Sequence, residues 1–460
     1  RTWFLEEGSS RRVAAVSGVG GDGSCAHLIL SEASARQQRS CHYLAESSPF
    51  LFPLACDDPV GLKQELDVLR KEVEVGTSLA KTAAGVYERS RKGAPSKCRL
   101  AIVGKDREEI LQEIDGARDA VEEASATGKD WASLRGSYLT LNPVGEEGKV
   151  AFVYPGGYNS YVGMGRDVFH LFPEMHEALC KVSSRLGEMV GEKILYPRNL
   201  QKLPAEDLNR CENELLDRPV TMFESGIIFS ILYTRILRDC FGVEPQVTVG
   251  YSMGEVSMMY ALGVWDETDG MSRILRDSPL FRTRLAGPME TVREAWNLPK
   301  AEDKKEKIWY CYALRASAEK VREALKEESR AYLIFVNSPK EVVIAGEDQA
   351  LKRVIQRLGC EHFDVTVGDA IHCEIARADY EEMVRLHTVP VNPVPGIDFY
   401  SADRLAPIEI DPEVIANNIA TVYCHEVDFP RLVQKAYQDG ARVFIEVGAR
   451  ENCTNWIREI

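Results

Sequence analysis

The sequence predicts an α/β fold in which a small ferredoxin-like module interrupts a larger α/β unit, and three observations support this. Apolar strand-like runs alternate with amphipathic helical patterns along most of the 460 residues. The order βαββαβ over residues 307–367 is typical of a ferredoxin-like module. A G-x-S-x-G pentapeptide stands between a strand-like run and a helical pattern, which is where several α/β enzymes carry a nucleophile.

Composition places the chain among globular proteins and argues against several function classes. At roughly 150 residues per domain the length predicts about three domains, and we expect them to be part of a longer protein because the chain begins at Arg1 without an initiator methionine. The 56 Lys and Arg against 71 Asp and Glu give a net charge of −15, which argues against nucleic acid as a partner. We find no apolar run near the roughly 18 residues of a membrane span and expect no membrane partner. The 12 cysteines form no C-x-x-C pair and the 8 histidines show no metal-ligand spacing, so we expect free thiols, a cytoplasmic location and no metal site.

The punctuation of the chain predicts three unequal parts, over residues 1–35, 36–145 and 146–460. The first holds two strands within residues 13–30. The glycines of residues 18–23 fit G-x-G-x-x-G, but a strand follows where a dinucleotide site needs a helix, so we expect a tight turn and no bound cofactor. The second part has the pattern of a small α/β module, with strands predicted at 51–56 and 98–104 and helices at 57–74, 78–91 and 107–126.

The third part contains the inserted module and the pentapeptide. It opens with a strand over 150–154 that Pro155-Gly156-Gly157 ends, and a buried strand over 246–249 leads into the pentapeptide. A charge cluster over 302–307 precedes the insert. The insert's strands are predicted at 308–314, 331–337, 341–346 and 362–367, its helices at 318–328 and 348–358, and a strand over 442–448 and a helix over 451–460 end the chain.

The pentapeptide Gly250-Tyr251-Ser252-Met253-Gly254 predicts a nucleophile elbow. Its glycines permit the sharp turn that exposes the Ser252 hydroxyl, and the Met253 N–H at a helix start is a donor for an oxyanion. A second donor is expected from the Gly157 N–H, at the end of another strand. The alternative is a helix N-cap serine in a glycine-rich turn, and the flanking strand and helix favour catalysis.

A serine nucleophile needs a base within hydrogen-bond reach. His372 stands where the chain leaves the inserted module and re-enters the larger unit, 120 residues after Ser252. This position favours His372 as the base. On the residues alone the other histidines stay open, and they are His27, His42, His170, His176, His362, His387 and His425.

Five motifs in order give residues 149–460 a resemblance to the malonyl/acyl-CoA:carrier-protein acyltransferases of fatty-acid and polyketide synthases. They are Val153-Tyr154-Pro155-Gly156-Gly157 with Gly163-Met164-Gly165, Gly250 to Glu255, Asn337 to Gly346, Ile371-His372-Cys373, and Phe444 to Ala449. The resemblance implies an α/β-hydrolase-like acyltransferase subdomain with the ferredoxin-like insert. It also implies a Ser252–His372 dyad without a third carboxylate, in which a backbone carbonyl, expected from residues 426–428, orients the histidine.

The same resemblance implies substrates, partners and neighbouring domains. The substrate is a phosphopantetheine thioester, of CoA or of an acyl carrier protein, and no cofactor stays bound. Residues 13–33 resemble the last strands of a ketosynthase, and residues 36–145 resemble a ketosynthase-to-acyltransferase linker. Within the family the chain is most similar to acyltransferase domains of polyunsaturated fatty acid synthases.

Departures from the family pattern predict an uncharged acyl group. Malonyl-specific members carry an arginine 25 residues after the nucleophile, where this chain has Asp277, and Asp277 would repel a malonyl carboxylate. The H-A-F-H element of malonyl enzymes is Asp369-Ala370-Ile371-His372 in this chain, and Gly157 replaces a glutamine of the family. With Tyr251 and Asn337, both within family motifs, Asp277 and Ile371 are the predicted substrate-binding residues.

We therefore expect transfer of a non-carboxylated acyl group between a thioester donor and a carrier protein. The alternatives are hydrolytic release of acyl chains, malonyl-specific transfer and a structural docking module without catalysis. An α/β-hydrolase esterase fits the inserted module poorly. Because carriers are usually acidic, docking needs a basic face, for which the sequence offers Arg273, Arg276, Arg282 and Arg284.

Overall fold

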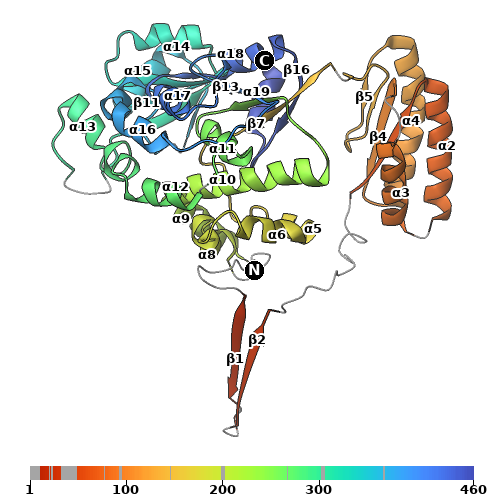
Figure 1. Ribbon diagram of the computed structural model, residues 1–460. Coiled ribbons are helices and arrows are strands. Elements are labelled where there is room, and N and C mark those ends of the chain that lie inside the picture. Colours follow the sequence, from red (N-terminus) through yellow and green to blue (C-terminus); the bar gives the residue numbers. More distant parts are fainter. Residues whose placement is uncertain are drawn as a thin grey trace. The chain divides into compact units, whose positions relative to one another are not determined.

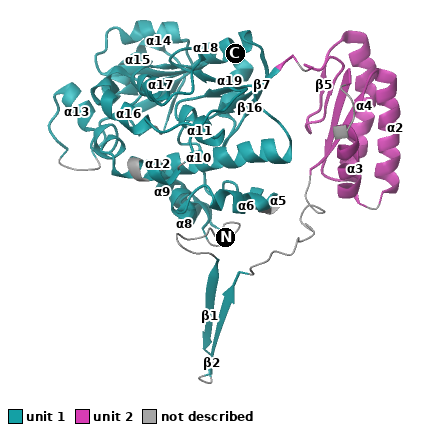
Figure 2. Cartoon of the chain, in the orientation of Figure 1, with its two compact units in different colours: residues 1–32, 149–460 teal, residues 33–148 magenta. Residues whose placement is uncertain are grey.

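The computed structural model describes residues 11–19, 21, 24–32, 49–76, 78–92, 96–145, 147–197, 203–266, 268–301, 306–365 and 368–460. The chain divides into two compact units (Figure 2). Unit 1 comprises residues 1–32 and 149–460, and unit 2 comprises residues 33–148. The assignment of residues 1–35 to a preceding ketosynthase stays a prediction.

Unit 2 is a small α/β module built on a four-stranded antiparallel sheet in the order β3-β4-β6-β5. The strands are β3 (Phe50–Cys56), β4 (Cys98–Gly104), β5 (Trp131–Ala132) and β6 (Tyr138–Thr140), and the helices are α2 (Pro59–Val75), α3 (Leu79–Lys92) and α4 (Arg107–Thr127). Asp58 and Asp106 cap α2 and α4 by accepting backbone N–H bonds. The strands and helices predicted for residues 51–126 are confirmed to within a few residues.

The first strands of unit 1 form a hairpin. Strands β1 (Val13–Val19) and β2 (Cys25–Ser31) pair antiparallel. The prediction that a strand follows the glycine-rich turn is therefore confirmed, while Gly20, Asp22 and Gly23 of that turn lie outside the described residues.

A five-stranded sheet in the order β14-β13-β8-β7-β16 forms the centre of unit 1 (Figure 1). Its strands are β7 (Lys149–Tyr154), β8 (Val247–Gly250), β13 (Asp398–Ser401), β14 (Ala406–Pro407) and β16 (Ala441–Glu446). All neighbours are parallel except β14, which pairs antiparallel at the edge. Because the carboxyl ends of parallel strands meet at one edge, the segments that follow β7 and β8 lie close together there.

The insert is a ferredoxin-like module, as predicted. Its elements are β9 (Tyr310–Leu314), α14 (Ala318–Leu325), β10 (Ala331–Ser338), β11 (Glu341–Gly346), α15 (Asp348–Leu358) and β12 (His362–Asp364). The sheet order β12-β9-β11-β10 is antiparallel throughout. Strand β15 (Val427–Asp428) of the larger subdomain adds to β10 in parallel, which ties the insert to the rest of unit 1.

Helices pack around the two sheets of unit 1. They are α5 (Val168–Leu171), α6 (Pro173–Cys180), α7 (Leu186–Met189), α8 (Glu192–Leu195), α9 (Ala205–Leu216), α10 (Pro219–Arg235), η2 (Ile236–Cys240), α11 (Gly254–Ala261), α12 (Thr268–Asp277), η3 (Leu280–Arg284), α13 (Glu290–Trp296), η4 (Glu374–Asp379), α16 (Tyr380–His387), α17 (Pro412–Cys424), α18 (Phe429–Gln438) and α19 (Asn452–Glu459). Helix α10 with η2 gives a segment, Pro219–Cys240, that is long and apolar enough to cross a membrane, contrary to the sequence prediction. Two-thirds of its apolar window is buried inside the protein, so the segment has the character of a core helix.

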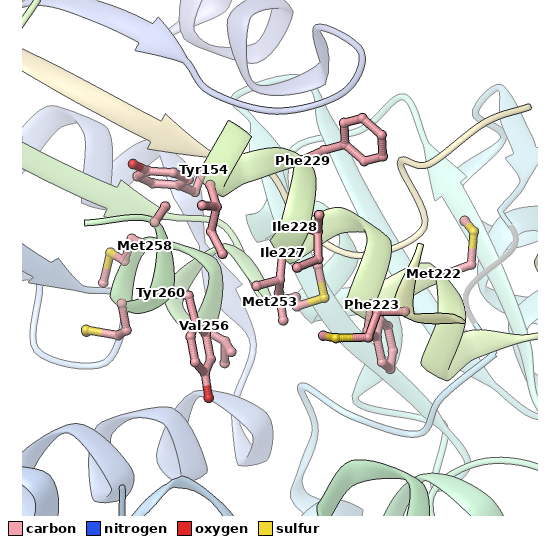
Figure 3. Close-up of a cluster of buried hydrophobic side chains, with 14 of the residues drawn as sticks. Tyr154, Met222, Phe223, Ile227, Ile228, Phe229, Met253, Val256, Met258 and Tyr260 are labelled. Carbon is pink, nitrogen blue, oxygen red and sulfur yellow. The ribbon is translucent and has the colours of Figure 1, made fainter. Parts of the chain in front are cut away.

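Figure 3 shows how α10 meets the helix that follows the pentapeptide. Phe223 and Ile227 of α10 lie near Val256 of α11 and near Met253, the residue before that helix, in one cluster of buried side chains. This packing fixes the start of α11, and with it the residue before that helix.

Candidate active site

Ser252 occupies a strained turn between β8 and α11. Its φ of 56° is left-handed, which costs a non-glycine residue on the order of 1 to 3 kcal/mol. The flanking glycines are sterically required, because a Cβ on Gly250 would collide with the Glu255 backbone and a Cβ on Gly254 with the Tyr154 carbonyl. The pentapeptide thus forms the elbow that the sequence predicts.

His372 lies directly against the Ser252 hydroxyl. The distance from Ser252 Oγ to His372 Nε2 is 2.7 Å, and His372 Nδ1 lies 2.8 Å from the Val422 carbonyl oxygen. Because a carbonyl only accepts, Nδ1 carries the proton and Nε2 is free to act as a base. The orienting carbonyl comes from α17, so the expectation that residues 426–428 supply it is wrong.

The backbone of α17 also fixes the His372 main chain. The His372 N–H donates to the Tyr423 carbonyl at 2.6 Å, and the residue has a left-handed φ of 62°. Its ring lies between Phe335 and Tyr423, with centroid distances of 4.7 and 5.9 Å. Burial lowers the pKa of His372 to about 4, against the opposing effect of the Val422 hydrogen bond. The imidazole is therefore neutral near pH 7, as a general base must be.

The two predicted oxyanion donors belong to residues beside Ser252. Met253 follows the serine at the start of α11, and Gly157 follows β7; both line the same cavity as Ser252. A Cβ on Gly157 would come within 2.8 Å of the Phe223 ring. The packing of α10 therefore accounts for a glycine at this position.

Ser252 opens into a cavity of about 680 Å³. Its exposed lining is polar and consists of Arg315, Arg450, Asn455 and Glu459, whereas its buried lining is mostly apolar or aromatic. The buried apolar and aromatic residues are Phe223, Ile227, Tyr251, Met253, Val256, Tyr260, Trp265, Phe281, Phe335, Val343, Ile371, Leu386, Tyr423 and Cys453, with Gly156, and the buried polar ones are Ser252, Asn337, Asp369 and His387. No Lys or Arg belongs to this buried lining among the described residues.

Three of the four predicted substrate-binding residues line this cavity: Tyr251, Asn337 and Ile371. The Tyr251 hydroxyl donates to Asn337 Oδ1 at 2.7 Å, and its ring stacks on Phe335 at 4.9 Å. This bond joins the elbow to strand β10 of the insert, so the two subdomains share one cavity wall.

Asp277 does not line the cavity, contrary to the sequence prediction. Its side chain is exposed at the end of α12, and Leu275 lines the cavity instead. Residues two apart on a helix point about 200° away from each other, so Leu275 and Asp277 face opposite ways. The position 25 residues after the nucleophile therefore lies outside the wall of this cavity.

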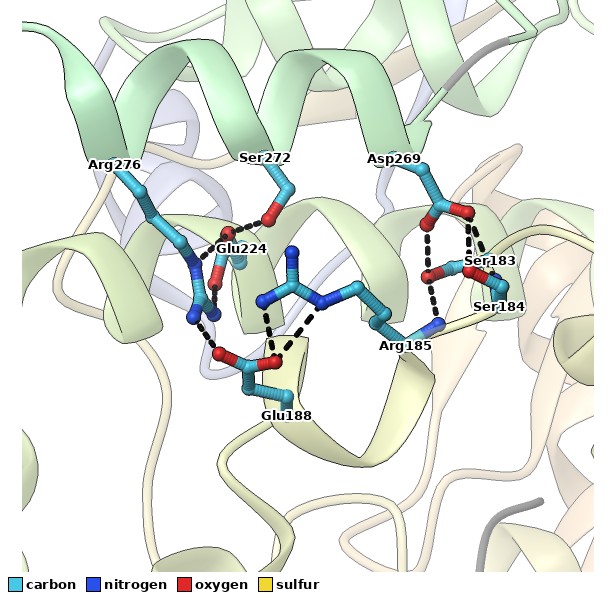
Figure 4. Close-up of polar contacts among 8 residues, drawn as sticks. All are labelled: Ser183, Ser184, Arg185, Glu188, Glu224, Asp269, Ser272 and Arg276. Carbon is cyan, nitrogen blue, oxygen red and sulfur yellow. Dashed lines mark hydrogen bonds and ion pairs between the residues drawn. The ribbon is translucent and has the colours of Figure 1, made fainter. Parts of the chain in front are cut away.

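The neighbouring arginine is already held by acidic side chains (Figure 4). Arg276 Nε lies 3.0 Å from one carboxylate oxygen of the buried Glu224, and its terminal nitrogen lies 2.6 Å from the other. Arg276 also pairs with Glu188. This bidentate arrangement joins α12 to α10 through Arg276, and Arg276 is not among the residues that line the cavity.

The predicted basic docking face is also partly neutralised. Arg276 is paired as above, and Arg284 pairs with Asp379 and, at 3.2 Å, with Glu294. Arg282 is exposed, and the side chain of Arg273 lies outside the described residues. The four arginines therefore do not form a uniform cationic surface.

Two acidic residues lie near the dyad: the sequence singled out Asp369 only as a departure within a family motif, and it assigned no role to Glu255. Asp369 lies in the buried cavity wall, and Glu255 follows the elbow in α11. Glu255 Oε1 accepts from the Ala402 N–H at 2.6 Å, and burial raises its pKa to about 8. Glu255 lies within a family motif and Asp369 lies near the histidine, but the sequence does not show that both carboxyl groups are buried.

The comparisons with known proteins agree with this geometry. Among curated relatives, a polyunsaturated fatty acid synthase of Thraustochytrium sp. has a subunit that is 26% identical over 494 residues, which cover 100% of this chain and 24% of the relative. Polyketide synthase GfsE of Streptomyces halstedii is 24% identical over 466 residues, covering 97% of this chain and 11% of the relative. The chain thus spans a quarter or less of these relatives.

Solved structures share the fold, and a family model matches most of the chain. The acyltransferase domain from module 8 of the salinomycin polyketide synthase superposes with a TM-score of 0.62 at 19% identity, covering 90% of this chain and 88% of that one. A malonyl-transacylase in complex with a type II acyl-carrier protein gives a TM-score of 0.52 at 20% identity, covering 68% and 93%. The family model for the acyl transferase domain matches residues 151–457. With its α/β subdomain, ferredoxin-like insert and serine elbow, the chain belongs to the acyl transferase domain family.

Proposed function

We propose that this acyltransferase moves an uncharged acyl group from a phosphopantetheine thioester to an acyl carrier protein through a Ser252 acyl-enzyme. One observation carries the proposal: the Ser252–His372 pair, joined at 2.7 Å, opens into a cavity whose buried lining is apolar. The donor is a thioester of CoA or of a carrier protein.

The reaction begins with nucleophilic attack by the serine. His372 Nε2 takes the hydroxyl proton as Ser252 Oγ bonds to the thioester carbonyl carbon. The negative charge that develops on the carbonyl oxygen is stabilised by the N–H groups of Met253 and Gly157. Collapse of the tetrahedral intermediate breaks the C–S bond, and the departing sulfur takes the proton from the His372 imidazolium.

The second half-reaction reverses the first with a new thiol. His372 removes the proton from the acceptor thiol, whose sulfur attacks the ester carbonyl of the acyl-enzyme. The C–O bond to Ser252 breaks, and the serine oxygen recovers its proton from His372. Water in place of the thiol would release a free acid, which is the hydrolytic alternative.

The preference for an uncharged acyl group follows from the cavity lining. A buried carboxylate without a cation partner carries a cost of several kcal/mol, and the described buried lining offers none. This supports a hydrocarbon chain as substrate.

The partners we propose are the domains of a larger synthase. Relatives named as polyunsaturated fatty acid and polyketide synthases contain a region like this chain, and one structurally similar transacylase is in complex with an acyl-carrier protein. These similarities support an acyl carrier protein as acceptor. The sequence resemblance and the composition alone are the basis for proposing a ketosynthase as neighbouring domain and the cytoplasm as location.

The test is the intact mass of the protein after incubation with malonyl-CoA, acetyl-CoA or a long-chain acyl-CoA. We expect acetyl and long-chain adducts that disappear in Ser252→Ala, and little malonyl adduct. Addition of a holo carrier protein should move the label to the carrier; free acid instead indicates hydrolysis. An adduct from malonyl-CoA alone would refute the substrate class, and no adduct from any thioester would leave only a docking role.

A further inference from the structure

His387 is a buried histidine in the cavity wall that the proposed mechanism does not use, and it is one of the histidines that the sequence leaves open. It is the last residue of α16 and is 6% exposed. Its Nδ1 lies 2.7 Å from the Met383 carbonyl oxygen, one turn earlier in the same helix. Because a carbonyl only accepts, Nδ1 carries the proton of the neutral ring, and Nε2 is a hydrogen-bond acceptor.

This acceptor is free and faces the cavity. Nε2 of His387 has no hydrogen-bond partner among the described residues. It is also not one of the polar atoms that the protein encloses completely, and His387 lines the cavity, so Nε2 is open to that space. Burial lowers the pKa of His387 to about 4, against the opposing effect of the Met383 hydrogen bond. The ring therefore stays neutral near pH 7 and keeps the lone pair on Nε2.

Outside the dyad, the other buried polar groups of the cavity wall are already bonded or enclosed. Asn337 Oδ1 accepts from the Tyr251 hydroxyl at 2.7 Å. Asp369 Oδ2 accepts from the Tyr158 hydroxyl at 3.1 Å, and Asp369 Oδ1 is fully enclosed by the protein. His387 differs from these residues because it presents an unpaired acceptor to the cavity. A buried polar atom without a partner is unusual and calls for an explanation.

The position of His387 assigns this acceptor to the acyl chain. The Tyr423 ring packs edge-to-face against both His372 and His387, at centroid distances of 5.9 and 5.6 Å, so the acceptor lies close to the dyad. Leu386, beside it on α16, and Trp265 belong to the same buried lining. The exposed residues at the opening of the cavity are a different set. A group bound at Nε2 is therefore part of the chain that enters the buried part of the cavity.

We propose that His387 Nε2 accepts a hydrogen bond from a hydroxyl group on the acyl chain, so that hydroxyacyl thioesters are a substrate class of this site. The ring offers only an acceptor, so the chain has to supply the donor, and a hydroxyl is a neutral donor. A keto oxygen at the same position only accepts and cannot make this bond. The inference rests on the proposed function, because it assigns the cavity to a neutral acyl group.

The experiment offers the protein decanoyl-CoA in competition with hydroxydecanoyl-CoA, using isomers that differ in the position of the hydroxyl. The two acyl-enzymes differ in mass by an oxygen atom, so rapid-quench intact-mass spectrometry gives the ratio of their acylation rates. We expect the wild-type ratio to depend on the position of the hydroxyl and to be highest for the isomer whose hydroxyl reaches Nε2. The oxodecanoyl-CoA with its keto group at that position should show no such maximum.

Variants of His387 assign the preference to this residue. His387→Leu replaces the acceptor with an apolar side chain and should lower the ratio for the preferred isomer about tenfold, the effect of losing one buried hydrogen bond. His387→Gln keeps an acceptor, and its ratio should lie closer to the wild type than to His387→Leu. His425→Leu is the same substitution at an exposed residue outside the cavity lining and should follow the wild type.

Two results would overturn the inference while leaving the proposed function intact. One is a wild-type ratio that is the same for every isomer, and the other is a His387→Leu ratio for the preferred isomer that equals the wild-type value. The wild-type series can refute the inference even if the variants fail to fold. The absence of any acyl adduct, from decanoyl-CoA as well as from its hydroxy isomers, would instead refute the proposed function, and this inference with it.

Discussion

Glu255 carries a buried carboxyl group that lowers the stability of the protein as the pH rises, and its amide variant should remove this effect. Its pKa is about 8 in the folded chain, against the usual 4.5, chiefly because of burial. Between these two values the unfolded state has lost the proton that the folded state still binds. Stability therefore falls as pH rises through this window, and levels off above pH 8.

The size of the effect follows from the pKa difference. At pH 7, which is 2.5 units above the usual pKa of 4.5, the Glu255 carboxyl of the folded chain is still protonated. At about 1.4 kcal/mol per pH unit, this lowers the free energy of unfolding by about 3 kcal/mol. Glu255→Gln keeps an acceptor for the Ala402 N–H. The NH₂ group of the glutamine replaces Oε2, which has no partner among the described residues. The buried donor without a partner lowers the stability of the variant by about 1 to 3 kcal/mol at every pH.

The decisive quantity is therefore how the difference in free energy of unfolding between Glu255→Gln and the wild type changes with pH. Urea denaturation followed by tryptophan fluorescence at pH 5, 6, 7 and 8 should show Glu255→Gln gaining about 4 kcal/mol relative to the wild type across the series. Asp277→Asn, at an exposed site, is the matched control and should run parallel to the wild type. Parallel curves for Glu255→Gln and the wild type would show that Glu255 is ionised in the folded chain, and would refute the reasoning.

Three further predictions concern the dyad, the cavity and the elbow. Because His372 has a pKa of about 4, acylation by a neutral thioester should keep its rate from pH 7 down to about pH 5 in stopped-flow assays, whereas a fall centred on pH 6.5 would contradict the buried, neutral imidazole. Leu386→Trp fills the buried lining and should lower long-chain acylation at least tenfold more than acetylation; equal losses would show that the chain lies elsewhere. Gly254→Ala puts a Cβ into the Tyr154 carbonyl and should abolish the acyl-enzyme, while Gly85→Ala, in a helix with only Arg89 nearby, should leave acylation unchanged.

Local sequence patterns were sufficient to predict the helices, the strands and the elbow at Ser252, because the residues that determine these structures lie within the same short segments. The βαββαβ order follows from alternating apolar positions and turn residues, and the glycines beside Ser252 belong to a pentapeptide whose turn is set by its own residues. The carbonyl that orients His372 comes from Val422, 50 positions away, and no local pattern reports such a contact. Asp277 shows a second limit of prediction from local patterns. Its distance along the chain from Ser252 matches the family pattern, but its place on α12 directs it away from the cavity.

The dyad is held by the backbone, and this determines which substrates suit it. His372 is oriented by the Val422 carbonyl at 2.8 Å, and a carbonyl cannot stabilise an imidazolium as fully as a carboxylate does. Burial keeps the pKa of His372 low, against the opposing effect of the Val422 hydrogen bond, and the dyad carries no charge until Ser252 attacks. A mostly apolar cavity is compatible with such a dyad, because the dyad itself holds no permanent ion that needs water. A carboxylated acyl group would bring a permanent charge into this cavity and lose its solvation without gaining a cation, so the orientation of the histidine and the lining of the cavity favour the same class of neutral acyl thioesters.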